Sequence, residues 1–483
     1  MPTETTIESV IALSKRRGFI YPGSEIYGGL ANTYDYGPLG AELLRNIKNV
    51  WWSEFIQKRQ DMVGLDASII SSHQVWDASG HTSGFSDSLV DCLNCKARTR
   101  ADHLIEDYFE DKTEEFKKNP LPADTDIPNL IDPAGRVRVE GLSTAQMDLI
   151  ISHFHIPCPT CKKHTWTAVR TFNLLFPVNL GIIEGEQSLA YLRGETAQGI
   201  FINFKNVVDT NRVRLPFGIG QIGKSFRNEI TLGNSIFRTI EFEQAEIEYF
   251  FDPETSDWNN LFDAWKDTMW EFVTKTLGIN EKNLRWRAHT DEERSFYSRK
   301  TEDLEYKYPF GYKELWGLAY RTDYDLKAHM THSKKDLSIL DPHTNKKIVP
   351  HVIEPAVGVN RLMLMILCDS YREVEGRTYL ALHPRIAPYK VAVFPLVANK
   401  PDLIGKAQQV FELLQKNMTV MWDDRGNIGK RYAAQDEIGT PFCITVDYET
   451  LENNTVTVRS RDDAQQVRIS IDTINEYLLP FLI

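Results

Sequence analysis

The chain has 483 residues, 42% of them hydrophobic and 25% charged, and carries a formal charge of −12. This length exceeds what one hydrophobic core usually serves, so two or three domains are expected, and the negative charge argues against a nonspecific nucleic-acid-binding protein without excluding a local basic track. The polar first residues and the lack of a long apolar run argue against a secretory signal and a membrane span, and therefore predict a cytoplasmic protein.

The N-terminal residues predict a short helix, an ordered loop and a longer helix. Gly18 lies where a helix C-cap would, and the glycine- and tyrosine-rich residues 18–40 predict a loop whose glycines let backbone approach a ligand. Apolar residues recur at helical spacing over 39–59, and a strand-like run follows at 63–70. A long helix leading into a strand is therefore expected.

Two pairs of cysteines with CxxC spacing lie in a stretch of changed composition, from about residue 86 to 168. Four thiolates fill the tetrahedral shell of zinc, and close cysteine pairs in a reducing cytosol favour metal binding over disulfides. The expected ligands of a structural zinc are Cys92, Cys95, Cys158 and Cys161. The alternative is free cytosolic thiols.

Residues 223–251 carry the most informative pattern. Two β-prone runs flank a Leu-Gly-Asn-Ser segment, which predicts a long antiparallel hairpin. Strand alternation places Phe242, Gln244, Glu246 and Glu248 on one face and Glu241 and Glu243 on the other. Such a charged face is usually solvated, but an arginine, several acids and an aromatic ring also suit a ligand with phosphates, a base and an ammonium group.

Three further segments complete the predicted first domain. Residues 258–278 predict an amphipathic helix, and residues 305–326 predict a strand that carries Glu314. Residues 348–367 predict an apolar strand that ends at Glu354-Pro355, a turn at Gly358 and a helix. Arg361 would lie in the first turn of that helix, where backbone N–H groups suit anions.

A new pattern begins at His383-Pro-Arg-Ile-Ala-Pro388. Alternating strands and helices over residues 383–483 predict a separate α/β domain, with a glycine-flanked basic segment at 427–441. The expected domains are therefore 1–382, which contains the insertion, and 383–483.

Phe-Arg-Asn-Glu at 226–229 and Phe-Arg-Thr-Ile-Glu-Phe-Glu-Gln at 237–244 resemble motif 2 of the class II aminoacyl-tRNA synthetases, in the form found in glycyl-tRNA synthetases. The helix and strand from residue 39 resemble motif 1, residues 348–367 resemble motif 3, and residues 383–483 are similar to the anticodon-binding domain that glycyl, histidyl, prolyl and threonyl enzymes share. The resemblance implies an α+β fold: an antiparallel sheet flanked by helices, a zinc-bearing insertion and a C-terminal α/β domain.

The resemblance also implies an activity and its partners. The activity is ATP-dependent attachment of glycine to the 3′ end of tRNA(Gly) through a glycyl-adenylate, by a homodimer that uses Mg²⁺. Arg227 would hold the α-phosphate, Glu229 the adenine amino group and Arg361 the far phosphates, and these two arginines are the implied catalytic residues.

The implied site residues fall into two sets. The ATP-binding set is Arg227, Asn228, Glu229, Phe237, Arg238, Phe242, Glu314, Leu315, Gly358 and Arg361, with Phe242 stacked on the base and Glu314 on magnesium. The glycine-binding set is Arg100, Glu195, Phe242, Glu243, Gln244, Glu246, Glu354 and Gly358, with Glu195, Glu246 and Glu354 around the ammonium. Arg321 is a further candidate, for the substrate carboxylate. For Arg100 the alternative is a solvated arginine that opens a helix.

Lys430, Arg431, Arg459 and Arg461 are the implied RNA contacts, with a solvated face as the alternative. The sequence departs from the family pattern at Gly194, where proline is usual, Ile240 (arginine), Ala356 (serine) and Asn360 (often aspartate), and motif 1 lacks its proline.

Two other functions are alternatives to that of a glycyl-tRNA synthetase. The first is another class II synthetase, but the threonyl, prolyl and histidyl forms lack this glycyl-like block at 226–244. The second is a non-catalytic relative, such as the synthetase-shaped accessory subunit of a mitochondrial DNA polymerase. The presence of Arg227, Glu229 and Arg361 argues against it.

Overall fold

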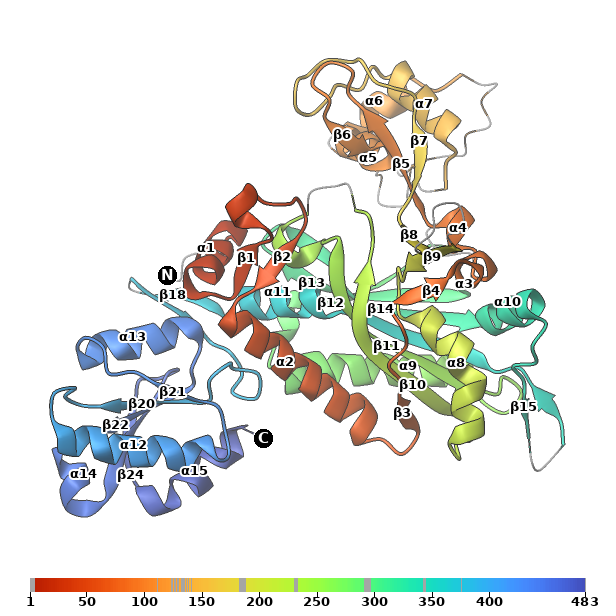
Figure 1. Cartoon of the computed structure of the whole chain (residues 1–483). Helices are drawn as coiled ribbons and strands as arrows, with labels where there is room; N and C mark the ends of the chain where they lie inside the picture. The colour runs from red at the N-terminus through yellow and green to blue at the C-terminus, as the bar shows by residue number, and fades with distance from the viewer. Residues whose placement is uncertain are drawn as a thin grey trace.

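A seven-stranded sheet forms the centre of the molecule (Figure 1), which we describe from a computed structural model. The structure describes residues 5–482 apart from 111, 123–124, 126, 128–129, 132–134, 136, 138, 140, 182–187, 230–232, 291–296, 342–344 and 375. In spatial order the strands are β12 (Leu284–Ala288), β13 (Lys300–Tyr308), β14 (Gly311–Thr322), β17 (His351–Gly358), β11 (Glu241–Phe251), β10 (Phe217–Phe226) and β3 (Met62–Gly64). All neighbours pair antiparallel except β10 and β3, which confirms the predicted antiparallel sheet.

Helices cover both faces of this sheet. One face packs its apolar side chains against α2 (Pro38–Trp52), α9 (Trp258–Glu271) and α11 (Val359–Ser370). The other face packs against α8 (Ala197–Thr210) and α10 (Tyr324–Ser333). The alternation of β11 shows both layers, since Ile247 and Phe251 belong to the first core and Phe250 to the second.

The N-terminal segment begins with α1 (Ile7–Arg17), which ends at Gly18 in the left-handed conformation (φ 76°), as predicted. A small sheet of β1 (Ile20–Pro22) and β2 (Tyr34–Tyr36) follows. The predicted long helix is present as α2, which begins at Pro38 and continues as a π-helical turn over Ser53–Gln57. The predicted strand at 63–70 is shorter than expected: β3 ends at Gly64, and β4 covers only Ile70–Ser72.

A three-stranded sheet and two short helices lead to the insertion. The sheet has the order β4, β9 (Ser188–Leu192), β8 (Phe176–Leu180), and the helices are α3 (His73–Ala78) and α4 (His81–Gly84). The insertion projects from this base at the top of Figure 1 and has an apolar core of its own. It contains β5 (Ser86–Asp91), β6 (Arg98–Arg100), α5 (Ala101–Phe109), α6 (Thr113–Lys118), α7 (Thr144–His153) and β7 (Arg170–Asn173).

Two predicted features of the sheet need correction. The paired strands exist as β10 and β11, but β10 ends at Phe226 and β11 begins at Glu241, with a 3₁₀ turn at Ser235–Phe237 between them. Arg227 and Glu229 therefore lie outside both strands. Leu232 of the predicted turn lies outside the described residues. The strand expected to end at Glu354-Pro355 continues to Gly358. The pairing of β17 with β11 is interrupted at these two residues, so Pro355, which has no N–H group, can lie within the strand.

The C-terminal domain is an α/β unit with its own core. Its sheet has the order β21 (Val420–Trp422), β20 (Val391–Pro395), β22 (Phe442–Val446), β23 (Thr455–Ser460), β24 (Gln466–Ser470). Its helices are α12 (Pro401–Gln415), α13 (Ile428–Ile438), α14 (Tyr448–Asn453) and α15 (Ile474–Leu482). The segment expected only as basic and glycine-flanked is therefore mostly the helix α13. Between the domains, β18 (Tyr371–Val374) and β19 (Arg377–Leu380) form a hairpin, as do β15 (Ile339–Leu340) and β16 (Lys347–Ile348) within the first domain.

Three of the four basic residues expected to contact RNA have structural partners instead. Arg431 is 2% exposed and donates to carbonyl oxygens such as that of Pro395, at 2.6 Å. Arg459 is 8% exposed and pairs with Asp436, and Arg461 is 2% exposed and donates to the Gly439 carbonyl. Only Lys430 of this set is exposed. A charged residue in sequence does not reveal whether folding buries it with a partner.

Ion pairs join the C-terminal domain to the rest of the chain. Arg16 and Arg17 of α1 both contact Glu437 of α13. Arg385 contacts Glu54 at 2.9 Å, after α2. Within the part of the chain that the structure describes, every helix is too short or too polar to traverse a lipid bilayer.

Candidate active site

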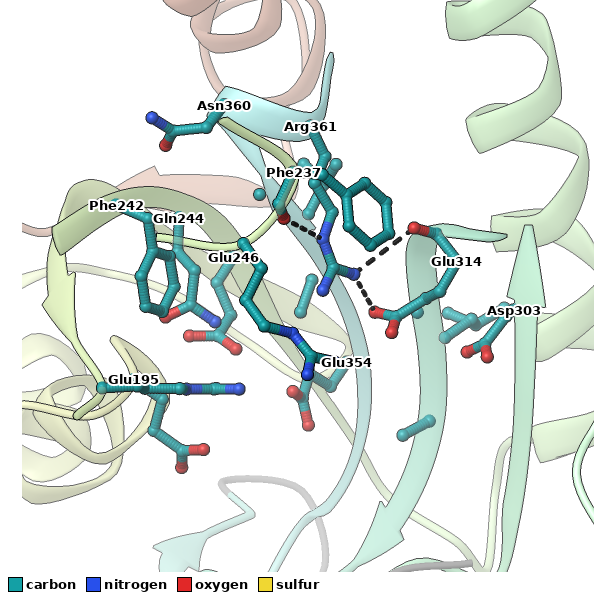
Figure 2. A pocket seen from close by; sticks show the side chains of 18 of the residues that line it. Glu195, Phe237, Phe242, Gln244, Glu246, Asp303, Glu314, Glu354, Asn360 and Arg361 are labelled. Carbon is teal, nitrogen blue, oxygen red and sulfur yellow. Dashed lines mark hydrogen bonds and ion pairs between the residues drawn. The ribbon is translucent and has the colours of Figure 1, made fainter. Parts of the chain in front are cut away.

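A cavity of about 350 Å³ lies against one face of the central sheet (Figure 2). Its walls come from the 227–240 loop, from β11, β14 and β17, and from the first turn of α11. The structure brings the following predicted residues to its lining: Glu195, Arg227, Glu229, Phe237, Arg238, Phe242, Gln244, Glu246, Glu314, Glu354, Gly358 and Arg361. Residues far apart in the chain therefore converge on one cavity.

Arg361 lies at the Glu314 side of the cavity. Its guanidinium contacts a Glu314 carboxylate oxygen at 3.0 Å and donates to the carbonyl oxygens of Phe237 and Glu314, both at 3.3 Å (Figure 2). The Phe237 ring centroid lies 4.6 Å from its Cζ atom. The Arg361 charge lowers the pKa of Glu314, so an anionic carboxylate and a cation stand side by side here.

Two buried oxygens in the cavity lack a hydrogen-bond partner among the described residues. They are Glu229 Oε2 and Gln244 Oε1. Arg238 approaches Glu229 Oε2 only to 3.9 Å. A buried acceptor without a donor costs free energy in the empty protein, so both atoms are suited to accept from a ligand.

Arg227 has a different set of partners. Its Nε donates to the Gly194 carbonyl at 3.0 Å, and its Cζ lies 5.4 Å from the Phe242 ring centroid. Among the residues that the structure describes, no carboxylate forms an ion pair with it. Its charge is therefore uncompensated beside the cavity.

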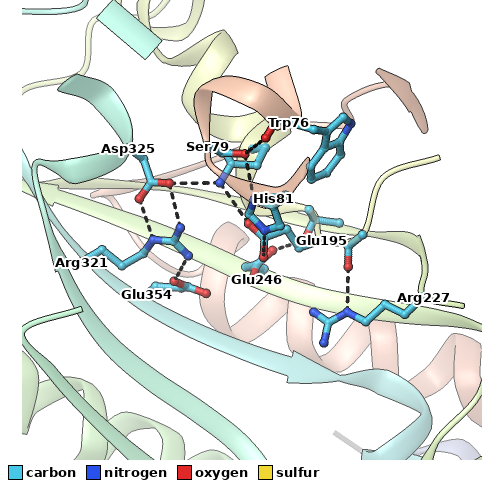
Figure 3. Close-up of polar contacts among 12 residues, drawn as sticks. Trp76, Ser79, His81, Glu195, Arg227, Glu246, Arg321, Asp325 and Glu354 are labelled. Carbon is cyan, nitrogen blue, oxygen red and sulfur yellow. Dashed lines mark hydrogen bonds and ion pairs between the residues drawn. The ribbon is translucent and has the colours of Figure 1, made fainter. Parts of the chain in front are cut away.

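A buried network of acids forms the opposite end of the cavity (Figure 3). Glu195 contacts His81 Nε2 at 3.3 Å and accepts from Gln198 at 3.0 Å. Glu246 accepts from the hydroxyl of Thr196, and Glu354 pairs with Arg321 at 2.6 Å. The three acids come from the start of α8, from β11 and from β17.

The charges around these three acids shift their pKa values in different directions. Burial alone would raise the pKa of Glu195, but His81 and Arg321 lower it below its ordinary value. Burial and the neighbouring Glu354 and Glu195 raise the pKa of Glu246 well above its ordinary value. Burial and Glu195 also raise the pKa of Glu354, despite Arg321. The surroundings therefore favour the protonated form of Glu246 and the anionic form of Glu195.

Glu248 lies below this cluster and outside the cavity lining. It is 0% exposed, and neither of its carboxylate oxygens has a hydrogen-bond partner among the described residues. Burial, and next Glu354, raise its pKa well above the ordinary value. A neutral carboxyl is consistent with that position.

Arg321 does not face the cavity as expected for a residue that meets a substrate carboxylate. It is 1% exposed, binds Asp325 through Nε and Nη2, both at 2.8 Å, and also holds Glu354. Both acids raise its pKa, although burial opposes them. Its function in the structure is to compensate the buried acids (Figure 3).

The structure does not bring four other predicted residues to the cavity. Glu243 points to the opposite face of β11, as the strand alternation required, and pairs with Lys48 at 2.8 Å. Leu315 is buried in the core, and Asn228 donates its backbone N–H to Leu174. Arg100 lies in the insertion and pairs with Asp87 and Asp102.

The sequence interpretation missed a group of lining residues on the β13 side. They include Asp303, which lies 2.7 Å from His289 Nε2, and Tyr297, whose ring centroid lies 4.0 Å from Arg321 Cζ. Glu314 was assigned from the family resemblance, and the resemblance named no role for Asp303. The positions of Tyr297 and His289 had no comparable signal.

The N-terminal segment supports the cavity from outside. Asn360 donates to the Tyr36 hydroxyl and accepts from the Glu243 N–H at 2.7 Å. The carbonyl of Asn32 accepts from the Ile240 N–H at 3.0 Å. Residues 18–40, expected as an ordered loop near a ligand, therefore hold the loop that carries Arg227.

The four cysteines of the insertion cluster as expected. Cys92 and Cys161 have their sulfurs 3.5 Å apart, and Cys95 and Cys158 have theirs 3.6 Å apart. All four sulfurs lie within 4.8 Å of one another. A tetrahedral zinc with Zn–S distances of about 2.3 Å needs sulfurs about 3.8 Å apart, so these residues fit that metal.

Two family models match the chain. Residues 182–370 match the tRNA synthetase class II core domain (G, H, P, S and T), and residues 390–479 match the anticodon binding domain. The glycine–tRNA ligase of Clostridium tetani is 51% identical over 99% of both chains. The chain belongs to the glycine–tRNA ligase family.

Other glycine–tRNA ligases match over the same length. Those of Clostridium acetobutylicum and Caldanaerobacter subterraneus are each 49% identical over 99% of both chains. Membership of the glycine–tRNA ligase family confirms the recognition made from the sequence and the class II fold. The roles of the individual site residues remain predictions.

The acid cluster predicts a pH dependence of glycine binding. The raised pKa of Glu246 favours its protonated form, whereas an ammonium group bound beside it favours the carboxylate. The other titratable and charged groups around it are Glu195, Glu248, Glu354, Asp325, Arg321 and His81. Below the raised pKa of Glu246 we expect the KM for glycine to fall by up to about tenfold per unit rise in pH. The KM for ATP, measured over the same range, is the control.

The measurement is steady-state pyrophosphate exchange from about pH 5.5 to about pH 7. The Glu246→Gln variant carries no proton to displace, so its weaker glycine binding should lose this dependence. A KM for glycine that does not change with pH in the unmodified protein would contradict the assigned protonation.

Proposed function

We propose that the protein attaches glycine to the 3′ end of tRNA(Gly) in two steps, through a glycyl-adenylate made from ATP. The observation that carries the proposal is the single cavity with arginines at one end and buried acids at the other, in a member of the glycine–tRNA ligase family. Arginines suit the phosphates of ATP, and the acids suit an ammonium group. The cavity thus fits the two reactants of the first step.

In the first step the glycine carboxylate attacks the α-phosphorus of ATP, and pyrophosphate leaves. This reaction needs alignment and positive charge around the phosphates, and no protein nucleophile. We assign the α-phosphate to Arg227, which has no carboxylate partner among the described residues, and the far phosphates to Arg361. Glu229 Oε2 would accept from the adenine amino group, and Phe242 would stack on the base.

Mg²⁺ prefers carboxylate and phosphate oxygens, and the carboxylates of Glu314 and Asp303 fit such a group at the Arg361 end of the cavity. When bound, the metal would neutralise phosphate charge. Glu314 contacts the Arg361 guanidinium, so the phosphates of ATP would compete with Glu314 for this guanidinium.

Selection of glycine must act on its ammonium group and on the absence of a side chain. Glu195, Glu246 and Glu354 would bind the ammonium, held in place by His81, Thr196 and Arg321 respectively. A hydrophobic pocket distinguishes one methylene by only about 1 to 3 kcal/mol, so exclusion of alanine must be steric. In the second step the 3′-hydroxyl of the tRNA attacks the adenylate.

The test is pyrophosphate exchange into ATP with each of the twenty amino acids. We expect exchange with glycine alone, and a loss of about a hundredfold or more in kcat for Arg227→Ala, because one preorganised charge is removed from the transition state. Arg45→Ala is the matched control, since Arg45 is exposed on α2, outside the cavity lining.

Exchange that persists in Arg227→Ala would refute the role assigned to that residue. Exchange with another amino acid would refute the substrate, and no exchange with any would favour a non-catalytic relative. The C-terminal domain would contact the anticodon of tRNA(Gly), as its family match suggests.

We further propose that Cys92, Cys95, Cys158 and Cys161 hold one structural zinc. All four ligands come from the protein, so the metal would bind no substrate. Elemental mass spectrometry should find about one zinc per chain, and Cys161→Ser should lose it and make residues 86–173 more sensitive to proteases. Cys443→Ala, in the C-terminal core, is the control. Well under one zinc per chain in the unmodified protein would end this proposal.

We also propose that two copies of the chain form a dimer through the surface around β4, β8 and β9. Large apolar side chains are exposed there: Ile69, Ile70, Leu180 and Leu189, with Ile202 of α8. A surface of this kind is unusual on a monomer. The nearby strand β3 is an edge of the central sheet.

Sedimentation equilibrium should give twice the chain mass of 55.5 kDa. The double variant Ile70→Asp, Leu189→Asp should sediment as a monomer, because charges on both exposed positions oppose apolar association. Leu340→Asp is the control, because Leu340 is 53% exposed but lies elsewhere, on β15. A monomeric unmodified protein would refute the dimer.

A further inference from the structure

The Arg227 guanidinium lies between two aromatic rings. Its Cζ is 5.4 Å from the centroid of Phe242, on the cavity wall, and 5.1 Å from the centroid of Phe85. Phe85 directly precedes β5, the first strand of the insertion. It lies outside the cavity lining and carries no group that reacts.

We infer that Phe85 is a positioning residue for Arg227, through which the base of the insertion sets the orientation of the phosphate-binding guanidinium. The inference rests on the proposed function, in which Arg227 binds the α-phosphate. Rings on two sides of the guanidinium and the Gly194 carbonyl on its Nε leave its other N–H groups for an anion.

Phe85 is itself firmly placed. Its ring lies 5.1 Å from that of His81, the residue that contacts Glu195, and its N–H donates to the His81 carbonyl at 3.2 Å. The carbonyl of Phe85 accepts from the Leu174 N–H, and the carbonyl of Leu174 accepts from the Asn228 N–H. These contacts connect both strands at the base of the insertion to the residue that follows Arg227.

Gly194 leaves the space that the Phe85 ring occupies. A Cβ atom at Gly194 would lie 3.1 Å from Phe85 Cε1 and 3.0 Å from Leu175 Cδ2. Both distances are shorter than ordinary contacts between carbon atoms, so a side chain at 194 would displace one of these two residues. The same glycine supplies the carbonyl that accepts from Arg227.

We expect the Phe85 ring to affect the orientation of Arg227 and not the affinity for glycine. The acids of the glycine end are held by His81, Thr196, Gln198 and Arg321. Of these only His81 packs against Phe85, and His81 keeps its contacts with the Ser79 hydroxyl and the Trp76 ring when the Phe85 ring is removed. Loss of the ring should therefore lower the rate of adenylate formation and leave glycine affinity almost unchanged. Only another aromatic ring should restore the rate.

The test compares Phe85→Leu with Phe85→Tyr in the full-length protein, by steady-state pyrophosphate exchange. We expect Phe85→Leu to lower kcat by about three- to thirtyfold, with the KM for glycine within about twofold, and Phe85→Tyr to recover most of the loss. Phe172→Leu is the matched control, because Phe172 lies on β7 at the same base.

Gly194→Ala is the second variant. It leaves the Phe85 side chain intact but crowds its ring, so kcat should fall in the same direction. Thermal melting and zinc content of each variant, compared with those of the unmodified protein, separate this effect from a disturbed insertion.

The inference is overturned if Phe85→Leu retains full kcat, or if Phe85→Tyr is as impaired as Phe85→Leu. It is also overturned if kcat and glycine affinity fall together, as a merely structural role would require. These outcomes differ from failure of the proposed function, which appears as absent glycine-dependent exchange in the unmodified protein.

Discussion

The candidate site depends on the electrostatic compensation of acids buried on one face of the central sheet. Five carboxyl groups gather there, and the basic side chains that contact them are those of Arg321 and His81. Arg321, which is 1% exposed, spans Asp325 and Glu354 and so connects α10 to β17. Without these partners the acids would have to be neutral, because an unpaired buried charge is very costly. The acids outnumber the basic side chains that contact them, which suits a ligand with a positive charge.

The antiparallel sheet places the two halves of the site on adjacent strands. β11 carries Phe242 and Gln244 near the arginines and Glu246 among the acids. β17 carries Glu354 a few residues before α11, whose first turn contains Arg361. A strand rises about 3.3 Å per residue, so a few positions span the length of a nucleotide joined to a small amino acid. Described residues of the segment between β10 and β11, together with residues of β13 and β14, complete the walls.

Periodicity and motif spacing sufficed to predict the β11 face, the helix after Gly358 and the cysteine cluster, because these patterns repeat locally. The same alternation already excluded Glu243 from the face of Glu246, yet the family resemblance assigned both to glycine. Arg321, Arg431, Arg459 and Arg461 were wrongly expected to meet ligands. Sequence shows that a residue is charged, but the partner that neutralises it, such as Asp436 for Arg459, comes from a distant segment. No sequence pattern indicated Phe85, because a cation–π contact requires no fixed spacing between its two residues in the chain.

Because α1 contacts α13, the N-terminal segment connects the C-terminal domain to the cavity of the first domain. Glu437 holds Arg16 and Arg17, and the chain then runs from α1 to Asn32 and Tyr36, which touch the loop of Arg227 and the helix of Arg361. The N-terminal segment therefore contacts both the domain that matches the anticodon binding family and the residues around the cavity. A displacement of α13 can therefore reach both arginines through this segment, by the ion pairs at Glu437 and the hydrogen bonds of Asn32 and Tyr36.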